Sequence, residues 1–514
     1  MVSLEARSGS PTDDASTSVL GRALVARRGD VLLALAFLAT RLALYAAGLR
    51  FNLDLRWMFL EDVEALHQHL LRSVLYFHAF APGMNLITGV LLKISPAHLV
   101  GMATALFWAF GTAMTLSLAR ILSLLGTSRA TSFVLALAFS LLPQTLFLEN
   151  LYLYTYLCAC LVMVGAVLFH RALLAARVLA WLPFFLVCAV LGWLYTVFHL
   201  LWFVLMAGVA VVAQARTGNA SWRRALRVVA LAAAFPALLM VGLYAKNYVL
   251  FGVFGATSWG SANMTLATTQ QMRPAERNRW IREGKLSRYA AINVYAPPSA
   301  YAELVPKRVY PWPGSNELVR PTLGEPNFNH GLFLEVNDAR RKDVAYYLET
   351  RPLDYLRRVM SKNLPSLFSS TTHWHPHDRR PESPHRQHRQ VLGGYEQLYD
   401  ALVHGWPVPN VGLYVFLPVF IVWAAWASWK RLRAADANTF AAGALLGFCL
   451  LQILFVVSAS SLFTSWETSR YRYSVEPCIW VVVALGLRAA FVKLRARLRS
   501  LRRPAGTDTA GASG

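Results

Sequence analysis

The chain has 514 residues, of which 56% are hydrophobic and only 15% are charged. A soluble protein carries roughly 25% charged residues, and apolar runs of about 18 residues or more indicate membrane-spanning helices. The formal net charge is +23, but Lys and Arg lie in short segments between the apolar runs, which is the pattern that sets membrane orientation. The composition therefore predicts an all-α polytopic membrane protein and argues against a nucleic-acid partner.

We expect about ten transmembrane helices. They lie near residues 31–49, 98–122, 130–147, 150–169, 177–194, 196–214, 226–250, 408–429, 438–460 and 474–492. The basic residues of the turns all fall on one side if both termini are cytoplasmic. The expected tails are then residues 1–30 and the basic segment 493–514. The high content of Ala, Leu and Arg favours a bacterial inner (plasma) membrane.

Two segments are not expected to be simple spans. Residues 83–95 are apolar but too short to cross a bilayer, so we expect a juxtamembrane or re-entrant helix there. Residues 251–407 form one large extracytoplasmic region, which is too long to be a passive loop. Within that region the spacing over 337–364 predicts an amphipathic helix, and the composition of 373–390 predicts a loop.

Glu61 and Asp62 are the first candidates for chemistry. They lie on the first outer loop, 50–97, directly after the first span. A carboxylate fixed near the membrane surface could act as a general base on a substrate delivered by a lipid, or could bind a metal ion. Asp54 and Glu64 compete for the same role. The alternative is a solvated helix with ordinary surface charges.

Three further candidates lie where spans meet the outer face. His78 precedes a Pro-Gly turn and could orient a phosphate or a sugar hydroxyl, or be an ordinary interfacial histidine. Glu149 is an ionisable residue at membrane depth and so a functional candidate, with an interfacial turn as the alternative. Lys246 is a cation near the end of a span, which snorkelling explains equally well.

Arg470 and Arg472 lie before the last span, where two guanidinium groups run against the positive-inside bias. They suit bidentate binding of a phosphate or pyrophosphate. The alternative is an ion pair with Glu476 that closes the loop. The histidines of HWHPH, residues 373–377, form a weak metal motif because alternate residues of an extended chain point apart. We predict no metal site and no certain cofactor, and a divalent cation stays open.

These features resemble the GT-C glycosyltransferases, and among them the bacterial mannosyl- and aminoarabinose-transferase-like enzymes. Many members carry an Asp-Glu pair in the first outer loop, followed by a His-Pro-Pro-like turn. Here the pair Glu61-Asp62 is inverted, and Pro82-Gly83 stands where two prolines would be. Which of the two carboxylates matches the family residue stays open.

Two later segments carry the resemblance further. FVLALAFSLLPQTLFLENLYLYT resembles the GT-C segment that rises to an outer turn after a proline. RYRYSVEP resembles the Arg-Tyr-x-x-Glu-Pro-like entry to the last span of bacterial members. The resemblance covers 30–250 well, 408–492 loosely and 252–405 poorly.

The resemblance implies sugar transfer on the outer face from a polyprenyl-phosphate-linked donor to a glycan, lipid or protein acceptor. A first-loop carboxylate, Asp62 or Glu61, would deprotonate or position the acceptor hydroxyl. Arg470, Arg472 or Lys246 would stabilise the charge that grows on the leaving phosphate.

Two other functions stay open. A transporter or flippase of lipid-linked sugars would need ionisable residues at mid-membrane and repeated halves, and neither is evident in the sequence. An O-antigen polymerase- or ligase-like enzyme would depend on Arg and His in the late outer loop, and the stretch 373–390 keeps that possibility open.

Overall fold

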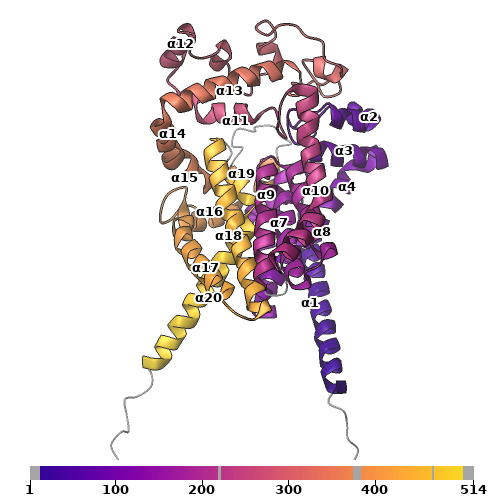
Figure 1. Ribbon diagram of the computed structural model, residues 1–514, viewed down its shortest axis with the longest axis vertical. Helices are drawn as coiled ribbons and strands as arrows, with labels where there is room; N and C mark the ends of the chain where they lie inside the picture. Colours follow the sequence, from indigo (N-terminus) through magenta and orange to yellow (C-terminus); the bar gives the residue numbers. More distant parts are fainter. Residues whose placement is uncertain (1–11, 218–220, 374–383, 466–467, 502–514) are drawn as a thin grey trace, which may run out of the picture.

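The computed structural model of the chain describes residues 12–217, 221–373, 384–465 and 468–501. Over these residues the protein is all-helical, with two isolated β-bridges and no longer strand. Figure 1 shows an elongated bundle with a helical cap at one end; α1 begins and α20 finishes at the other end. The all-α class predicted from composition is confirmed.

Within the described residues, seven helices are long and apolar enough to cross a membrane, which indicates a multi-pass membrane protein. They are α1 (Thr12–Ala46, apolar from Arg28), α4 (Leu99–Leu124), α7 (Tyr154–Ala175), α10 (Trp222–Phe251), α17 (Leu417–Leu432), α18 (Ala437–Phe463) and α20 (Glu476–Leu501). The shorter apolar helices α8 (Val178–Leu194) and α9 (Leu200–Arg216) have 17 residues each and pack in the same bundle. The expected number of ten spans therefore stays a prediction.

The segment 130–147, expected to be one span, is not a straight helix. α5 (Arg129–Ser140) and α6 (Pro143–Glu149) meet at an angle of 61°. Pro143 explains the break, because proline lacks an N–H and its ring disfavours helical backbone in the preceding residue. Leu142 is accordingly extended, with φ −58° and ψ 140°.

The first outer loop carries two short helices, α2 (Val63–Leu75) and α3 (Gly83–Ile94). They pack on each other and lie across the long axis of the bundle, beside its capped half (Figure 1). With 12 residues, α3 is too short to span a membrane. It matches the short juxtamembrane helix expected at 83–95.

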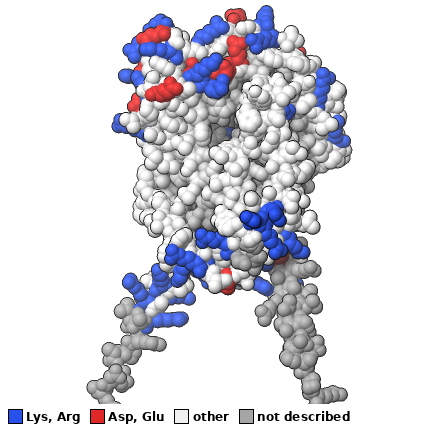
Figure 2. Space-filling view, in the orientation of Figure 1, with Lys and Arg blue, Asp and Glu red and all other residues white. Residues whose placement is uncertain are grey.

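Charged side chains gather at the two ends of the molecule and leave a wide band between them almost free of charge (Figure 2). The capped end shows both signs of charge, whereas the other end shows mainly Lys and Arg. Two turns meet at this basic end, where Arg431 Nη2 donates to Leu125 O at 3.2 Å. The described chain ends thus lie on the side of the basic turns.

The cap is built from the region between α10 and α17. Its helices are α11 (Gly260–Ala267), α12 (Pro274–Arg282), α13 (Leu332–Thr350), α14 (Pro352–Arg358) and α15 (Leu364–Leu367), while α16 (Pro384–Val403) lies beside the bundle and packs on α6. The single helix expected over 337–364 is wrong, because the chain breaks before Pro352. The loop expected over 373–390 is wrong from Pro384 onward, where α16 begins. Residues 374–383, which include two of the three HWHPH histidines, lie outside the described part of the chain.

Candidate active site on the outer face

The stretch 50–62, called loop 1 here, is tied to the bundle by its backbone. Asn52 N donates to Asn150 O at 2.8 Å, and Tyr152 N donates to Asn52 O at 3.1 Å. These bonds pair loop 1 with the short connection between α6 and α7. The turn at the broken span therefore sets where loop 1 begins.

Arg320, from the outer region, holds the other side of loop 1. Its side chain is 2% exposed. The guanidinium donates to four loop carbonyl oxygens at 2.6 to 3.2 Å, those of Leu55, Arg56, Trp57 and Leu60. Buried carbonyl groups need such partners. One cation from a distant segment therefore fixes the path of the loop.

Asp62 caps the helix that follows loop 1. Its Oδ1 accepts from Glu64 N at 3.0 Å and from Thr322 Oγ1 at 2.8 Å, and its Oδ2 accepts from Thr322 N at 2.9 Å. Asp is a preferred N-cap because its side chain satisfies amides of the first turn. Asp62 thus joins α2 to the outer region, and both its oxygens are engaged.

Glu61 has a different environment. The residue is 2% exposed; its Oε2 accepts from Asn329 Nδ2 at 2.8 Å and its Oε1 from Asp62 N at 3.3 Å. Burial raises the pKa of Glu61 above its ordinary 4.5, while these two hydrogen bonds and the nearby Arg320 oppose the rise. A carboxylate with a raised pKa accepts a proton more readily near neutral pH.

Asn329 connects Glu61 to His78. The Asn329 Oδ1 accepts from His78 N at 2.9 Å, and the His78 Nδ1 lies 2.9 Å from Ser258 Oγ. His78 is 1% exposed, and burial together with the neighbouring Lys246 lowers its pKa to about 3. His78 is therefore neutral at pH 7 and supplies no positive charge for a phosphate.

Lys246, near the outer end of α10, supports the same turn. Its Nζ donates to Phe77 O at 2.6 Å and to Val74 O at 3.5 Å. Val74 lies in the last turn of α2 and Phe77 just after the helix, so the cation anchors the turn that carries His78. The predicted phosphate-binding role gains no support from this arrangement.

A row of aromatic side chains runs from loop 1 to the segment before α20. Successive ring centroids lie 4.9 to 5.8 Å apart along Trp57, Phe59, Tyr154, Tyr195 and Tyr471. The Arg470 guanidinium lies 5.7 Å from the ring centroid of Tyr154 and 4.9 Å from that of Tyr471. Arg470 and the rings at both ends of the row are partly exposed. Aromatic faces beside a guanidinium suit a sugar phosphate.

Arg472 is buried and closes a loop. Its Nε donates to Glu476 Oε2 at 2.8 Å, and its Nη atoms donate to Leu367 O at 2.9 Å and Thr371 Oγ1 at 3.2 Å. This is the Arg–Glu pair that the sequence left as an alternative. Of the two arginines, Arg470 is the one that reaches accessible space.

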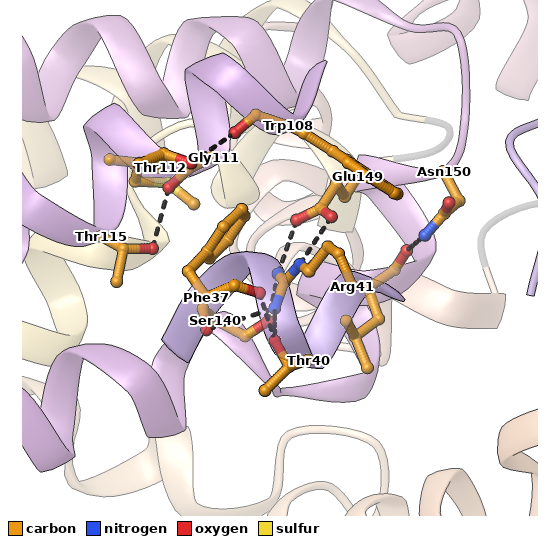
Figure 3. Close-up of polar contacts among 12 residues, drawn as sticks. Phe37, Thr40, Arg41, Trp108, Gly111, Thr112, Thr115, Ser140, Glu149 and Asn150 are labelled. Carbon is orange, nitrogen blue, oxygen red and sulfur yellow. Dashed lines mark hydrogen bonds and ion pairs between the residues drawn. The ribbon is translucent and has the colours of Figure 1, made fainter. Parts of the chain in front are cut away.

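Glu149 is paired within the bundle (Figure 3). Arg41 of α1 donates from Nε to its Oε1 at 2.8 Å and from Nη2 to its Oε2 at 2.6 Å, and Tyr156 Oη donates to Oε2 at 2.7 Å. The two charged side chains are 2% and 0% exposed. Such a bidentate pair is the favourable geometry for burying both charges.

The same guanidinium satisfies the break between α5 and α6. Arg41 Nη2 also donates to Ser140 O at 2.8 Å (Figure 3). A broken helix in a bilayer must find partners for the backbone groups it frees. Gly111 of α4 allows close packing here, because a Cβ there would lie 2.3 Å from Tyr156 Oη and 2.6 Å from the Phe37 ring.

Residues of this arrangement that were not among the sequence candidates include Arg41, Arg320 and Asn329. A signal existed for Arg41, a charge inside an apolar run. Arg320 and Asn329 lie more than 250 positions from the groups they hold, and no local pattern marks them. Among the described residues no group of three His, Cys, Asp or Glu side chains could hold a metal ion.

Comparison with protein-family models, curated proteins and solved structures found no match for this chain.

Replacing Arg41 by Ala is expected to lower the free energy of unfolding by about 3–5 kcal/mol, because Glu149 would stay buried without its cation. The double change Arg41→Met with Glu149→Met should cost less than Arg41→Ala. Unfolding in detergent micelles measures both, with the exposed Arg28→Ala on the same helix as the control. A double change that costs as much as Arg41→Ala, or more, would contradict a coupled pair.

Acid should loosen the turn that carries His78. Its folded-state pKa of about 3 lies below its ordinary 6.5, so its contribution to stability is present above pH 6.5 and is lost as the pH falls toward 3. Thermal unfolding between pH 7 and pH 4 should show this loss. The variant His78→Asn, which cannot titrate, should flatten the profile, and an unchanged slope would contradict the role given to His78.

Proposed function

We propose that the chain is an integral membrane glycosyltransferase of the GT-C type. It would move a sugar from a polyprenyl-phosphate-linked donor to an acceptor at the outer face of the membrane. The observation that carries this proposal is the environment of Glu61, a buried carboxyl group of raised pKa on the first outer loop, held by uncharged donors. The order of motifs that resembles GT-C enzymes independently favours the same loop.

In the proposed reaction Glu61 is the general base. An acceptor hydroxyl loses its proton to the Glu61 carboxylate while its oxygen forms a bond to the anomeric carbon of the sugar. The bond between that carbon and the phosphate oxygen breaks, and the polyprenyl phosphate leaves with the electron pair. Glu61 later returns the proton to solvent. Asp62 acts indirectly, because its hydrogen bonds to Thr322 and α2 keep Glu61 in place.

The donor would lie along the aromatic row. Its sugar would stack on the partly exposed ring of Tyr471, and the adjacent Arg470 would stabilise the negative charge on the departing phosphate. Near α19 (Thr468–Tyr473), which carries Arg470, a cavity of about 400 Å³ lies between α17 and α20. Its lining is almost entirely apolar, as in Phe420, Ile479 and Leu487, and it suits an isoprenoid tail.

The proposed orientation follows from charge. The basic end, with the described chain ends, would face the cytoplasm of a bacterial cell, and the capped end would face outward. The acceptor, a glycan, lipid or protein, would then reach loop 1 from the outer side. A divalent cation is not required by this scheme.

A second candidate function is movement of lipid-linked sugars across the bilayer. The observation that favours it is the Arg41–Glu149 pair, since buried ionisable residues in spans often mark transport pathways. Against it, the pair also satisfies the backbone of the broken span, which accounts for its presence.

The central test is sugar transfer from a panel of radiolabelled polyprenyl-phosphate sugars by membranes that contain the full chain. Glu61→Gln should lower the rate by about 10²–10⁴-fold, which is the usual contribution of a general base. The fold should persist, because a glutamine oxygen can still accept from Asn329.

Asp62→Asn is the matched control, since it removes the same charge at the next position and Asn is an equally good N-cap. It should keep transfer within about tenfold of wild type, a loss equivalent to about 1.4 kcal/mol. Loss of transfer in Asp62→Asn or in Asp54→Asn, with Glu61→Gln active, would contradict the role given to Glu61. Donor movement across vesicles without transfer would favour the second candidate.

A further inference from the structure

A large cavity at the basic end of the bundle takes no part in the proposed reaction. It has a volume of about 900 Å³ and lies between α9 and α18, with α17 on one side. Cavities that hold ligands in proteins usually measure about 300–1,000 Å³. Its lining is apolar apart from Arg216 and Arg433. The cavity is therefore an apolar groove with cations at one end.

The groove is closed at its inner end by polar contacts between the helices. Trp202 Nε1 of α9 donates to Gln452 Oε1 of α18 at 3.1 Å, and Gln452 Nε2 lies 3.2 Å from Met206 Sδ. Toward the basic end the two helices leave space between them, and Phe169 of α7 contributes to the lining. The groove thus runs along α9 and α18 from the level of these contacts to the two arginines.

The length of the groove matches one bilayer leaflet. Its lining on α18 runs from Phe440 to Leu454, which at about 1.5 Å per residue is roughly 21 Å. Its lining on α9 runs from Leu205 to Arg216, or roughly 17 Å by the same rise. The hydrocarbon of one leaflet is about 15 Å thick. Acyl chains that start at the arginines would end near Gln452.

The two arginines suit an anionic headgroup. Arg216 ends α9, and Arg433 follows α17 with its guanidinium 4.6 Å from the ring centroid of Trp429. Within the described part of the chain neither arginine pairs with a carboxylate. The nearby Asp436 caps α18 by accepting from Thr439 N at 2.8 Å. Arginine binds phosphate groups well because its donors form a planar fork.

We propose that this groove binds one anionic phospholipid of the leaflet at the basic end, with its phosphate between Arg216 and Arg433 and its acyl chains against α9 and α18. The site is separate from loop 1, and the proposal does not depend on the glycosyltransferase function.

Gly208 provides a test that fills the groove without disturbing the fold. It lies in the lining on α9, and a Cβ at this position would meet no atom within 4 Å. Leucine is a better helix former than glycine by up to about 1 kcal/mol, so Gly208→Leu should fold. Gly242 on α10 is the matched control, because it is equally open but lies outside the groove.

The measurement is native mass spectrometry of the full chain released from nanodiscs that contain phosphatidylglycerol and phosphatidylethanolamine in equal amounts. The wild type and Gly242→Leu should retain one phosphatidylglycerol, and Gly208→Leu should retain at least fivefold less. Arg216→Gln and Arg433→Gln should each lower the preference for phosphatidylglycerol about fivefold, the usual effect of one basic residue at an anionic surface. Arg223→Gln, at the same end but outside the groove, should change nothing.

Three outcomes would overturn the proposal. The first is equal retention of phosphatidylglycerol by Gly208→Leu and wild type. The second is retention of phosphatidylethanolamine to the same degree, which would make the groove a nonspecific lipid contact. The third is a dimer that Gly208→Leu dissociates, which would assign the groove to a second copy of the chain.

Discussion

The buried guanidinium of Arg41 is the interaction on which the arrangement of the outer face depends. It neutralises Glu149 and also satisfies the carbonyl of Ser140, where Pro143 interrupts a helix inside the membrane region. Without such a donor a break at this depth would leave an unpaired carbonyl in hydrocarbon. The break in turn places the connection between α6 and α7 beside Asn52, and loop 1 starts from that pairing.

The outer region completes what the bundle begins. Arg320 fixes the backbone of loop 1, Thr322 holds Asp62, and Asn329 joins Glu61 to the turn of His78. These three positions lie within ten residues of one another, so a single stretch of the cap shapes the whole loop. Two adjacent carboxyl groups thereby acquire different partners: Asp62 caps α2 and binds Thr322, whereas Glu61 accepts from Asn329 and is joined through it to the turn of His78.

The sequence predicted what depends on local pattern. Hydropathy predicted the seven long apolar helices of the described residues, and the short apolar run at 83–95 indicated a helix too short to cross the membrane. The sequence did not predict the break before Pro352, because the amphipathic spacing on both sides of it outweighed the effect of a single proline. It did not predict the start of α16 either, because the composition there is typical of a loop. Within the site, the sequence named both Glu61 and Asp62 but could not assign them different roles. Their hydrogen-bond partners, Asn329 and Thr322, lie far away in the chain and become neighbours only in the fold. The sequence left open whether Arg472 binds a phosphate or pairs with Glu476, because the partners of Arg472 are brought together only by the fold.

The most direct test of the central claim is where a donor binds. A polyprenyl-phosphate sugar that carries a diazirine on the sugar ring should, after irradiation of membranes containing the full chain, label peptides from loop 1 and from the segment around Arg470. Peptide mapping by mass spectrometry identifies the labelled residues. Labelling confined to the groove between α9 and α18, or to the surroundings of Arg41, would contradict an active site on the outer face.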